Sequence, residues 1–269
     1  MRRALGQSLR IDVAPHAVSL QRVSRFAGLG FGRAAGAPGT PATLASQQIT
    51  PSGEHPFDAI ANALRALLGE LDVAGWPVSF VLADELTRMW RVTPPAGAAR
   101  MADLEAAAGL RFQSLYGEPP SAWLVSADWD AAQPFFAAAV PRALLAVLGA
   151  VAQDCKLSIV AIEPRFVNAW NRSRSGLKPG GWFGHVHDSL LTLAAAEADG
   201  KSLRAIRPLP IPHGADHYWL TQTLQREALL LDMEAPQLLQ VNGNVPAAWI
   251  APVTNAAHIP CSALTGSAA

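Results

Sequence analysis

The stretch FFAAAVPRALLAVLGAVAQDCKLSIVAIEPRFVNAWNR, residues 135–172, decides the fold. Its first six residues are apolar and predict a strand. A helix follows, and Pro141 suits its start because proline is tolerated in the first turn of a helix. An apolar run without polar alternation then predicts a buried strand over 157–164, followed by a short helix over 165–174. This order of strands and helices is typical of an α/β domain.

The segment before this stretch predicts a first half that starts with an antiparallel hairpin. SLRIDVAPHAVSLQRV, residues 8–23, has the pattern of two short strands joined by a tight turn. A mobile loop rich in Gly, Pro and Ala follows and carries an edge strand near LASQQI, residues 44–49. A helix with one apolar face is then predicted over 57–71.

Two further blocks complete the expected layout. Residues 78–84 and 86–92 predict a pair of strands around an Asp84-Glu85 turn, and a helix over 101–117 and another strand pair follow. After KPGG the pattern predicts a three-stranded meander over 182–211 with a turn at Asp199-Gly200. A helix over 217–233 and a strand over 236–244 are predicted next. Both halves therefore begin with a meander and continue into helix and strand, which is a repeat of topology.

Composition excludes several classes of protein. The 21 Lys and Arg residues balance the 21 Asp and Glu residues, so nothing favours nucleic acid or an anionic membrane surface. The two cysteines, Cys155 and Cys261, are too far apart for a CxxC zinc motif. No apolar run follows the basic start or reaches the length of a membrane span. We expect a cytoplasmic protein without a transmembrane segment of its own.

Residues 135–172 resemble the central segment of PilM-type type IV pilus assembly proteins, which are related to FtsA and to the cytoplasmic part of type II secretion L proteins. Residues 79–117 are similar to the small inserted αβ subdomain of that family. WFGHVHDSLLTLAAAEADGKSLRAIRPLPI resembles its second phosphate hairpin, and LLQVNGN its late glycine turn. The resemblance implies an actin-like (ribonuclease H-like) fold with two lobes, of which the second is trimmed.

The resemblance also implies a division of the chain. The first-lobe hairpin, mobile loop and helix take 1–72, and the inserted subdomain takes 73–130. The rest of the first lobe follows at 131–176, the second lobe at 177–250 and a flexible tail at 251–269.

The positions that would bind nucleotide depart from the family pattern. Asp12 keeps the acid of the first hairpin, but Ala14, Pro15 and His16 occupy its turn, and proline removes an amide donor. The second hairpin has His185 where an acid–glycine pair is expected, and only Gly243 remains of the late glycine pair. With these departures, the resemblance implies a vestigial ATP site, no bound cofactor and a non-catalytic pseudo-ATPase.

The family's function implies a partner. Its members dock a cytoplasmic N-terminal segment of an inner-membrane pilus or secretion assembly protein. The resemblance therefore implies a scaffold that is peripheral to the inner membrane, and a homodimer is possible. The predicted strand 86–92 places Arg88 with Trp90 on one face and Met89 with Arg91 on the other. We expect Arg88, Trp90 or Arg91 to contribute to a peptide interface, unless Trp90 is core and the arginines are solvated.

A metal-dependent enzyme on an unrelated α/β fold is the alternative. His185 and His187 alternate on a predicted strand. His213 and His217 are four residues apart near the start of a predicted helix. Neutral imidazoles with a nearby carboxylate are suitable zinc ligands. No HExxH or similar signature accompanies them, and histidines of loops and helix starts also cap or form hydrogen bonds.

Overall fold

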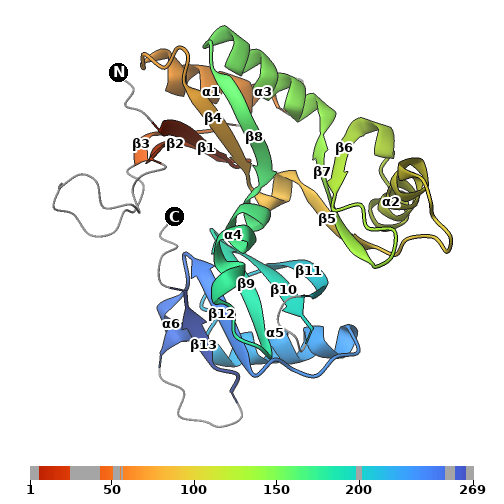
Figure 1. Cartoon of the computed structure of the whole chain (residues 1–269). Coiled ribbons are helices and arrows are strands. Elements are labelled where there is room, and N and C mark those ends of the chain that lie inside the picture. Colours follow the sequence, from red (N-terminus) through yellow and green to blue (C-terminus); the bar gives the residue numbers. More distant parts are fainter. Residues whose placement is uncertain are drawn as a thin grey trace. The chain divides into compact units, whose positions relative to one another are not determined.

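The computed structural model describes residues 6–24, 43–50, 55, 57–197, 202–251 and 258–264. The chain is a mixed α/β protein with three sheets, and it divides into two compact units, Met1–Arg165 and Phe166–Ala269 (Figure 1). Most of the predicted mobile loop and the predicted Asp199-Gly200 turn lie outside the described residues. No described helix is both long and apolar enough to cross a membrane.

The first unit is built on a five-stranded sheet in the order β3-β2-β1-β4-β8. Its strands are β1 (Gln7–Val13), β2 (Ala17–Ser24), β3 (Thr43–Gln48), β4 (Pro77–Leu82) and β8 (Ser158–Pro164). The first three strands form an antiparallel meander, whereas β4 and β8 run parallel to β1. The predicted hairpin at 8–23 and the predicted edge strand near 44–49 are confirmed.

Two helices, α1 (Asp58–Gly69) and α3 (Arg142–Asp154), share one apolar core with this sheet and pack against each other. The apolar face of α1 buries Ile60, Leu64 and Leu68, as its spacing predicts. Pro141 is the N-cap residue of α3, which confirms the helix start expected there. The α3 helix then leads into β8, so the stretch 135–172 forms the strand, helix, strand and helix that its pattern predicts.

The insert of the first unit is a three-stranded antiparallel sheet in the order β5-β7-β6, with one helix. Its elements are β5 (Arg88–Val92), α2 (Met101–Tyr116), the 3-10 turn η2 (Pro120–Ala122), β6 (Trp123–Ala127) and β7 (Phe135–Pro141). The predicted pairing of residues 78–84 with 86–92 is wrong. Strand β4 lies between β1 and β8 in the other sheet, where its continuous apolar run is buried on both faces. The turn η1 (Asp84–Leu86) carries the chain from one sheet to the other.

The second unit repeats the layout of the first. Its sheet has the order β11-β10-β9-β12-β13, with a meander on one side and two parallel strands on the other. Its strands are β9 (Gly181–His187), β10 (Leu190–Ala196), β11 (Leu203–Pro210), β12 (Leu238–Gly243) and β13 (Cys261–Ala263). The repeat of topology expected from the sequence is confirmed. Strand β13 was not predicted, because three residues within a Pro/Ala/Ser-rich stretch carry no strand signal.

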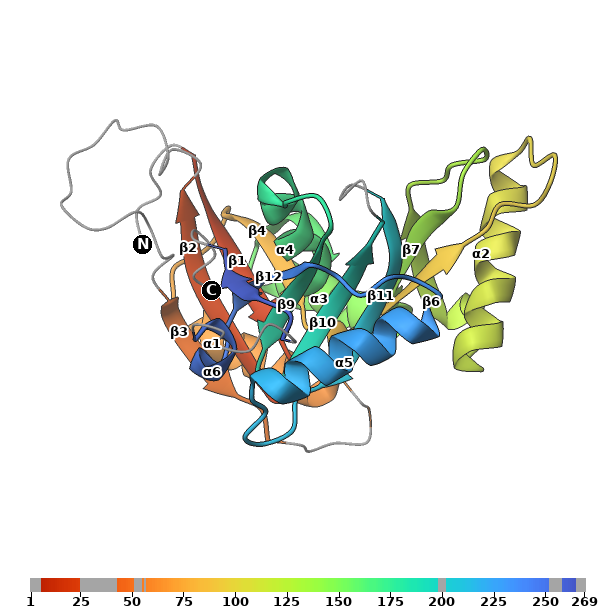
Figure 2. The same ribbon diagram turned by 90° about the horizontal axis from the view of Figure 1, so that it is seen from below.

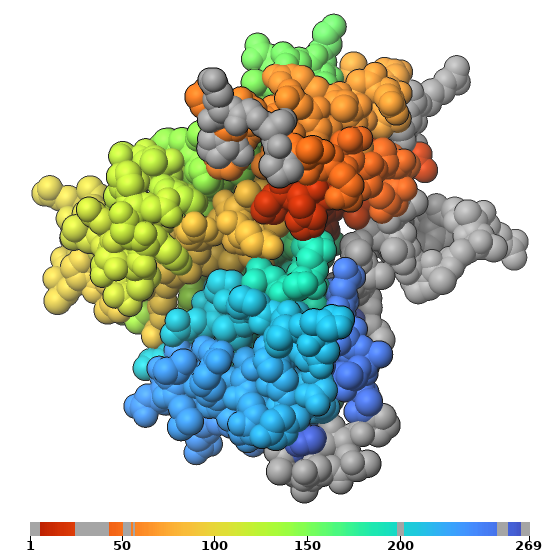
Figure 3. Space-filling model, turned by 180° about the vertical axis from the view of Figure 1, so that it is seen from behind, coloured from red at the N-terminus to blue at the C-terminus, as the bar shows by residue number. Residues whose placement is uncertain are grey.

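The two faces of this sheet differ in chemistry. One face packs Leu191, Leu193, Leu239 and Val241 against α5 (His217–Leu230), which lies across the strands in Figure 2. Seen from behind, the cyan and blue part of the chain, which includes β11 and α5, covers much of this unit (Figure 3). The short helix α6 (Ala247–Ile250) completes this core.

The other face carries α4 (Arg165–Ser173), which is followed by the turn η3 (Arg174–Gly176). Phe166 and Trp170 of α4 contact Phe183 of β9, with ring centroids 5.9 and 5.6 Å apart. This face also holds the buried polar residues Gln240 and Asn242 of β12. Alternation along a strand places His185 on the same face as Phe183.

Candidate functional site

The carboxylate of Asp12 lies in an ion-pair cluster within the first unit. Arg10 donates to it twice, with Nη2 2.8 Å from Oδ1 and Nε 3.0 Å from Oδ2. Nη2 of Arg165, the first residue of α4, lies 3.4 Å from Oδ1. All three side chains are at most 12% exposed. The acid that the sequence analysis assigned to the vestigial nucleotide site is therefore neutralised by two guanidinium groups of the chain itself.

The turn after Asp12 is closed by main-chain hydrogen bonds of its own chain. The amide of Ala14 donates to the carbonyl of Ala17 across the hairpin at 2.9 Å. Pro15 has no amide hydrogen, and the carbonyl of His16 accepts from the amide of Ile49. A phosphate-binding turn needs several amides that point at one spot. Pro15 cannot supply one, and the amide of Ala14 is already used across the hairpin.

In the second unit, His185 connects β9 to β12 and α4. Its Nδ1 forms a hydrogen bond with Oδ1 of Asn242, and Nδ2 of Asn242 donates to Oγ of Ser173 at 3.0 Å. Ser173 is the last residue of α4, so this chain of contacts fixes the helix end to the sheet. The sequence indicated His185 as a departure from the family pattern but did not predict these contacts.

Gly243 lies at the end of β12, where its conformation excludes other residues. Its φ is 90°, and a Cβ atom built on it would lie 2.0 Å from the carbonyl oxygen of Val186 and 3.3 Å from Cε1 of His185. The His185 ring therefore packs close to the glycine turn. The amide of Asn244 donates to the same Val186 carbonyl at 2.9 Å. Gly243 is required by the close approach of its own chain.

The histidines proposed as metal ligands are not brought together. His187 pairs with the neighbouring Asp188 at 3.2 Å, and Nε2 of His217 contacts the carbonyl oxygen of Ile259 at 2.7 Å. His217 also stacks on His258, while His213 is exposed in the loop before α5. Among the described residues no group of three or more His, Cys, Asp or Glu side chains has a metal-binding arrangement. The structure therefore does not support the metal-dependent alternative.

The two cysteines do not have the properties of activated nucleophiles. Burial raises the pKa of the Cys261 thiol to about 12. Burial, together with the Asp154 carboxylate, also raises the pKa of Cys155, although Arg65 opposes the shift. Reactive cysteines have a lowered pKa, because the thiolate is the nucleophile.

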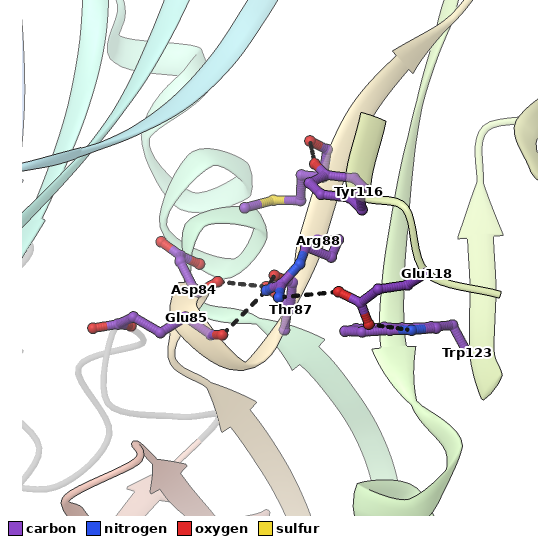
Figure 4. A network of polar contacts seen from close by, with 8 residues as sticks. Asp84, Glu85, Thr87, Arg88, Tyr116, Glu118 and Trp123 are labelled. Atoms are coloured by element: carbon purple, nitrogen blue, oxygen red, sulfur yellow. Dashed lines mark hydrogen bonds and ion pairs between the residues drawn. The ribbon is translucent and has the colours of Figure 1, made fainter. Parts of the chain in front are cut away.

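Arg88 is at the centre of a polar network inside the inserted subdomain (Figure 4). Its guanidinium carbon lies 5.6 Å from the ring centroid of Tyr116 and 5.3 Å from that of Trp123. Its Nη2 lies 3.4 Å from Oε1 of Glu118, whose other oxygen accepts from the indole of Trp123 at 3.0 Å. Its Nη1 donates to the carbonyls of Glu85 and Thr87. Arg88 thus connects β5 to the end of α2, to the start of β6 and to the turn before β5.

Trp90 is core and does not contribute to a surface. It is 3% exposed and packs edge-on against Phe112 of α2, with ring centroids 5.1 Å apart. Of the two faces considered for β5, the one with Arg88 and Trp90 therefore faces α2. Arg91 lies on the opposite face, which we call the outer face. It consists of the side chains of Met89, Arg91, Leu124, Ser126, Phe136 and Ala138.

The outer face is apolar with one cation. Leu124 is 46% exposed, Phe136 and Met89 are half-buried, and Arg91 stands opposite Phe136 across the strand pair. The sequence predicted the alternation along β5, but Leu124 and Phe136 were not predicted as site residues. The pairing of β6 and β7 beside β5 brings them there, and nothing in residues 86–92 indicates it.

The different roles of the two arginines give a stability prediction. We expect Arg88→Ala to lower the free energy of unfolding by about 1–2 kcal/mol, because it removes two ring contacts and a partly buried ion pair. Arg91→Ala is the matched control, and its effect should stay within about 0.5 kcal/mol. Urea unfolding of both variants measures the difference. Equal effects would contradict the structural role given to Arg88.

No protein-family model matches this sequence, and no curated protein matches it significantly. Solved structures do resemble the chain. One is the cytoplasmic domain of EpsL, an inner membrane component of the type II secretion system of Vibrio cholerae (TM-score 0.56, 12% identity, 89% of this chain and 83% of that chain). Another is the PilM–PilN type IV pilus biogenesis complex (TM-score 0.58, 15% identity, 90% and 82%).

A third solved structure is a Bacteroides thetaiotaomicron protein with an actin-like ATPase fold (TM-score 0.55, 11% identity, 90% of this chain and 84% of that chain). At these identities the likeness defines the fold. The chain has an actin-like fold, as the sequence resemblance implied. The match spans most of its length and includes both units.

Proposed function

We propose that this actin-like protein is a non-catalytic scaffold of a type IV pilus or type II secretion-like assembly. It docks the cytoplasmic segment of an inner-membrane partner and is held at the inner membrane through that partner. The likeness to the EpsL domain and to the PilM–PilN complex supports the assembly class. The observation that carries the non-catalytic part is the Asp12 cluster, in which Arg10 and Arg165 neutralise the acid.

The Asp12 cluster argues against a bound Mg²⁺–nucleotide for an electrostatic reason. A carboxylate that helps to hold a cation and phosphates needs its charge available to that cation. Here two arginines already compensate this charge in a largely buried setting, where such contacts are strong. In the second unit, Gly243 is packed against Val186 and the His185 ring. The contacts of Asp12 and Gly243 with groups of their own chain thus support the proposed loss of the nucleotide site.

Nucleotide binding can be tested by thermal unfolding of the full chain with ATP and Mg²⁺. A ligand at a hundred times its dissociation constant stabilises a protein by about 2.7 kcal/mol. For a chain of this length that raises the melting temperature by several degrees. We expect no saturable shift up to millimolar ATP, with a nucleotide-binding actin-like protein as positive control. A saturable shift below millimolar ATP would contradict the proposed loss of the site.

The outer face is the docking surface that we propose for the partner segment. It combines exposed and half-buried apolar side chains with the Arg91 cation, a composition that suits protein interfaces. Arg88 and Trp90 have structural roles, so of the residues first considered for docking we assign only Arg91 to the partner contact. A segment with apolar side chains and an acidic residue would complement this face.

Docking can be measured with peptides from the cytoplasmic N-terminal segments of inner-membrane assembly proteins encoded beside this chain. We expect at least one peptide to bind at micromolar concentration, and Arg91→Glu or Leu124→Asp to weaken it at least tenfold. Arg204→Glu, an exposed arginine on β11, is the charge-matched control. If the peptide binds all three variants equally, the outer face is not the docking site. If no such peptide binds the wild type, the scaffold proposal itself fails.

A further inference from the structure

Helix α5 packs one side against the sheet of the second unit and leaves its other side exposed (Figure 2). Among the described residues, the four most exposed large apolar side chains are those of Leu229, Leu110, Leu230 and Tyr218. Three of them lie on α5, where the exposed fraction is 81% for Leu229, 65% for Leu230 and 61% for Tyr218. Exposed apolar side chains that gather on one element indicate an interaction surface.

The exposed side of α5 has the spacing of a helix–helix seam. Tyr218, Gln222, Gln225 and Leu229 follow one another at intervals of four, three and four residues, and we call these four residues the α5 stripe. Two helices that pack along their length use this alternation of three and four residues at their contact. Three residues of the stripe are exposed and Gln225 is half-buried. The stripe is therefore suited to contact a second helix.

The order of residues in the α5 stripe matches its own reverse. Tyr218 and Leu229 are its apolar ends, Gln222 and Gln225 are its amide centre, and both pairs have the same midpoint in the sequence. An antiparallel copy of the helix therefore places Tyr218 on Leu229 of the second copy, and Gln222 on Gln225. An interface around a two-fold axis requires this match, because each residue contacts the same partner residue on the other copy.

The polar centre of the α5 stripe also favours a second copy. Nε2 of Gln222 lies 3.5 Å from Oε1 of Gln225, and this contact leaves both amides further donor and acceptor capacity, which the amides of a second copy match. Next to the stripe, Nη2 of Arg226 lies 3.0 Å from Oε1 of Glu227, which compensates its charge. The stripe itself is uncharged, so it does not select a partner of opposite charge, and it lacks the basic residues of a lipid-binding helix.

We propose that the protein forms a homodimer by antiparallel packing of α5 on α5 of a second copy, with the two-fold axis at the glutamine centre of the stripe. The dipoles of the two helices then oppose each other, so each positive helix end lies beside a negative one. Two helices of 14 residues meet over only about 21 Å. The interface is therefore small and the dimer weak, with a dissociation constant on the order of 10 µM. The α5 stripe belongs to the second unit, so this proposal is independent of the outer face and of any partner segment.

Sedimentation velocity of the full chain over about 1–200 µM tests the proposal, and the wild type is expected to shift from monomer to dimer across this range. Leu229→Ser raises the dissociation constant at least tenfold, because the lost apolar contact occurs twice in a two-fold dimer. Leu110→Ser, which changes a leucine of α2 that is 71% exposed, is the matched control and leaves the dimer unchanged. A wild type that stays monomeric at 200 µM overturns the proposal, as does an equal effect of the two substitutions.

Disulfide crosslinking tests the antiparallel orientation. Antiparallel packing places residue 218 of one copy beside residue 229 of the other, within reach of a disulfide, and keeps each position far from its own copy. Mild oxidation of an equal mixture of Tyr218→Cys and Leu229→Cys chains is therefore expected to give a covalent dimer. Neither variant alone should do so, nor the wild type, which retains Cys155 and Cys261. A mixture without a covalent dimer refutes the packing, and so does equal crosslinking of either variant alone.

Discussion

Replacing Asp12 with alanine is expected to lower the free energy of unfolding by about 3–5 kcal/mol. The variant keeps Arg10 and Arg165, which are 12% and 8% exposed, and removes one carboxylate of their ion cluster. The loss of an opposite charge from a poorly solvated ion cluster costs far more than the loss of a surface pair. Chemical unfolding monitored by tryptophan fluorescence measures the loss.

Two further variants test the reason for the effect of Asp12→Ala. Arg65→Ala breaks the Arg65–Asp154 pair, whose side chains are 47% and 58% exposed, and should cost less than about 1 kcal/mol. Asp12→Asn keeps the shape but not the charge, and should be nearly as unstable as Asp12→Ala. A cost below about 1 kcal/mol for Asp12→Ala would show that the cluster does not stabilise the fold.

We expect Gly243→Ala to destabilise the protein by at least about 3 kcal/mol. Two effects add at this position. Its φ of 90° is unfavourable for any residue with a side chain, and the added Cβ atom would lie 2.0 Å from the Val186 carbonyl oxygen. Because that oxygen belongs to the main chain of β9, the strand itself has to move.

Gly214→Ala separates these two effects. Gly214 has a φ of 74°, but a Cβ atom there meets nothing within 4 Å. The loss of unfolding free energy in Gly214→Ala therefore measures only the cost of a positive φ for a residue with a side chain, which is about 1 kcal/mol. Thermal unfolding of both variants gives the difference, which is the cost of the contact with Val186. If the two variants have equal stability, the close approach is not what requires glycine at 243.

The sequence predicted elements well where local pattern and burial agree. The helix of residues 101–117, the meander of β9 and β10 and the strand β12 all follow from periodicity and from their glycine and proline boundaries. The pairing of β4 was mispredicted, because adjacency in sequence favours a hairpin. The apolar run PVSFVL, which indicates a strand buried on both faces, was the better signal.

The contacts of the candidate site were predicted less completely, because most of them join residues that are far apart in the sequence. Asp12 was identified from the hairpin pattern, and alternation along β1 would also have placed Arg10 on the same face. Arg165 is remote in sequence and reaches Asp12 only because β8 and β1 are both strands of one sheet. Similarly, Arg88 was expected at a surface, since its contacts with Tyr116, Glu118 and Trp123 come from tertiary packing.

The hydrogen bond from the Tyr116 hydroxyl to the carbonyl of Met89, 3.0 Å long, has a consequence for how partners are distinguished. It ties the last residue of α2 to the main chain of β5, an edge strand of the three-stranded sheet. On the proposed docking surface, partners would then be distinguished by the side chains of the outer face, and exchanging a few residues of the docking segment would separate one assembly system from another.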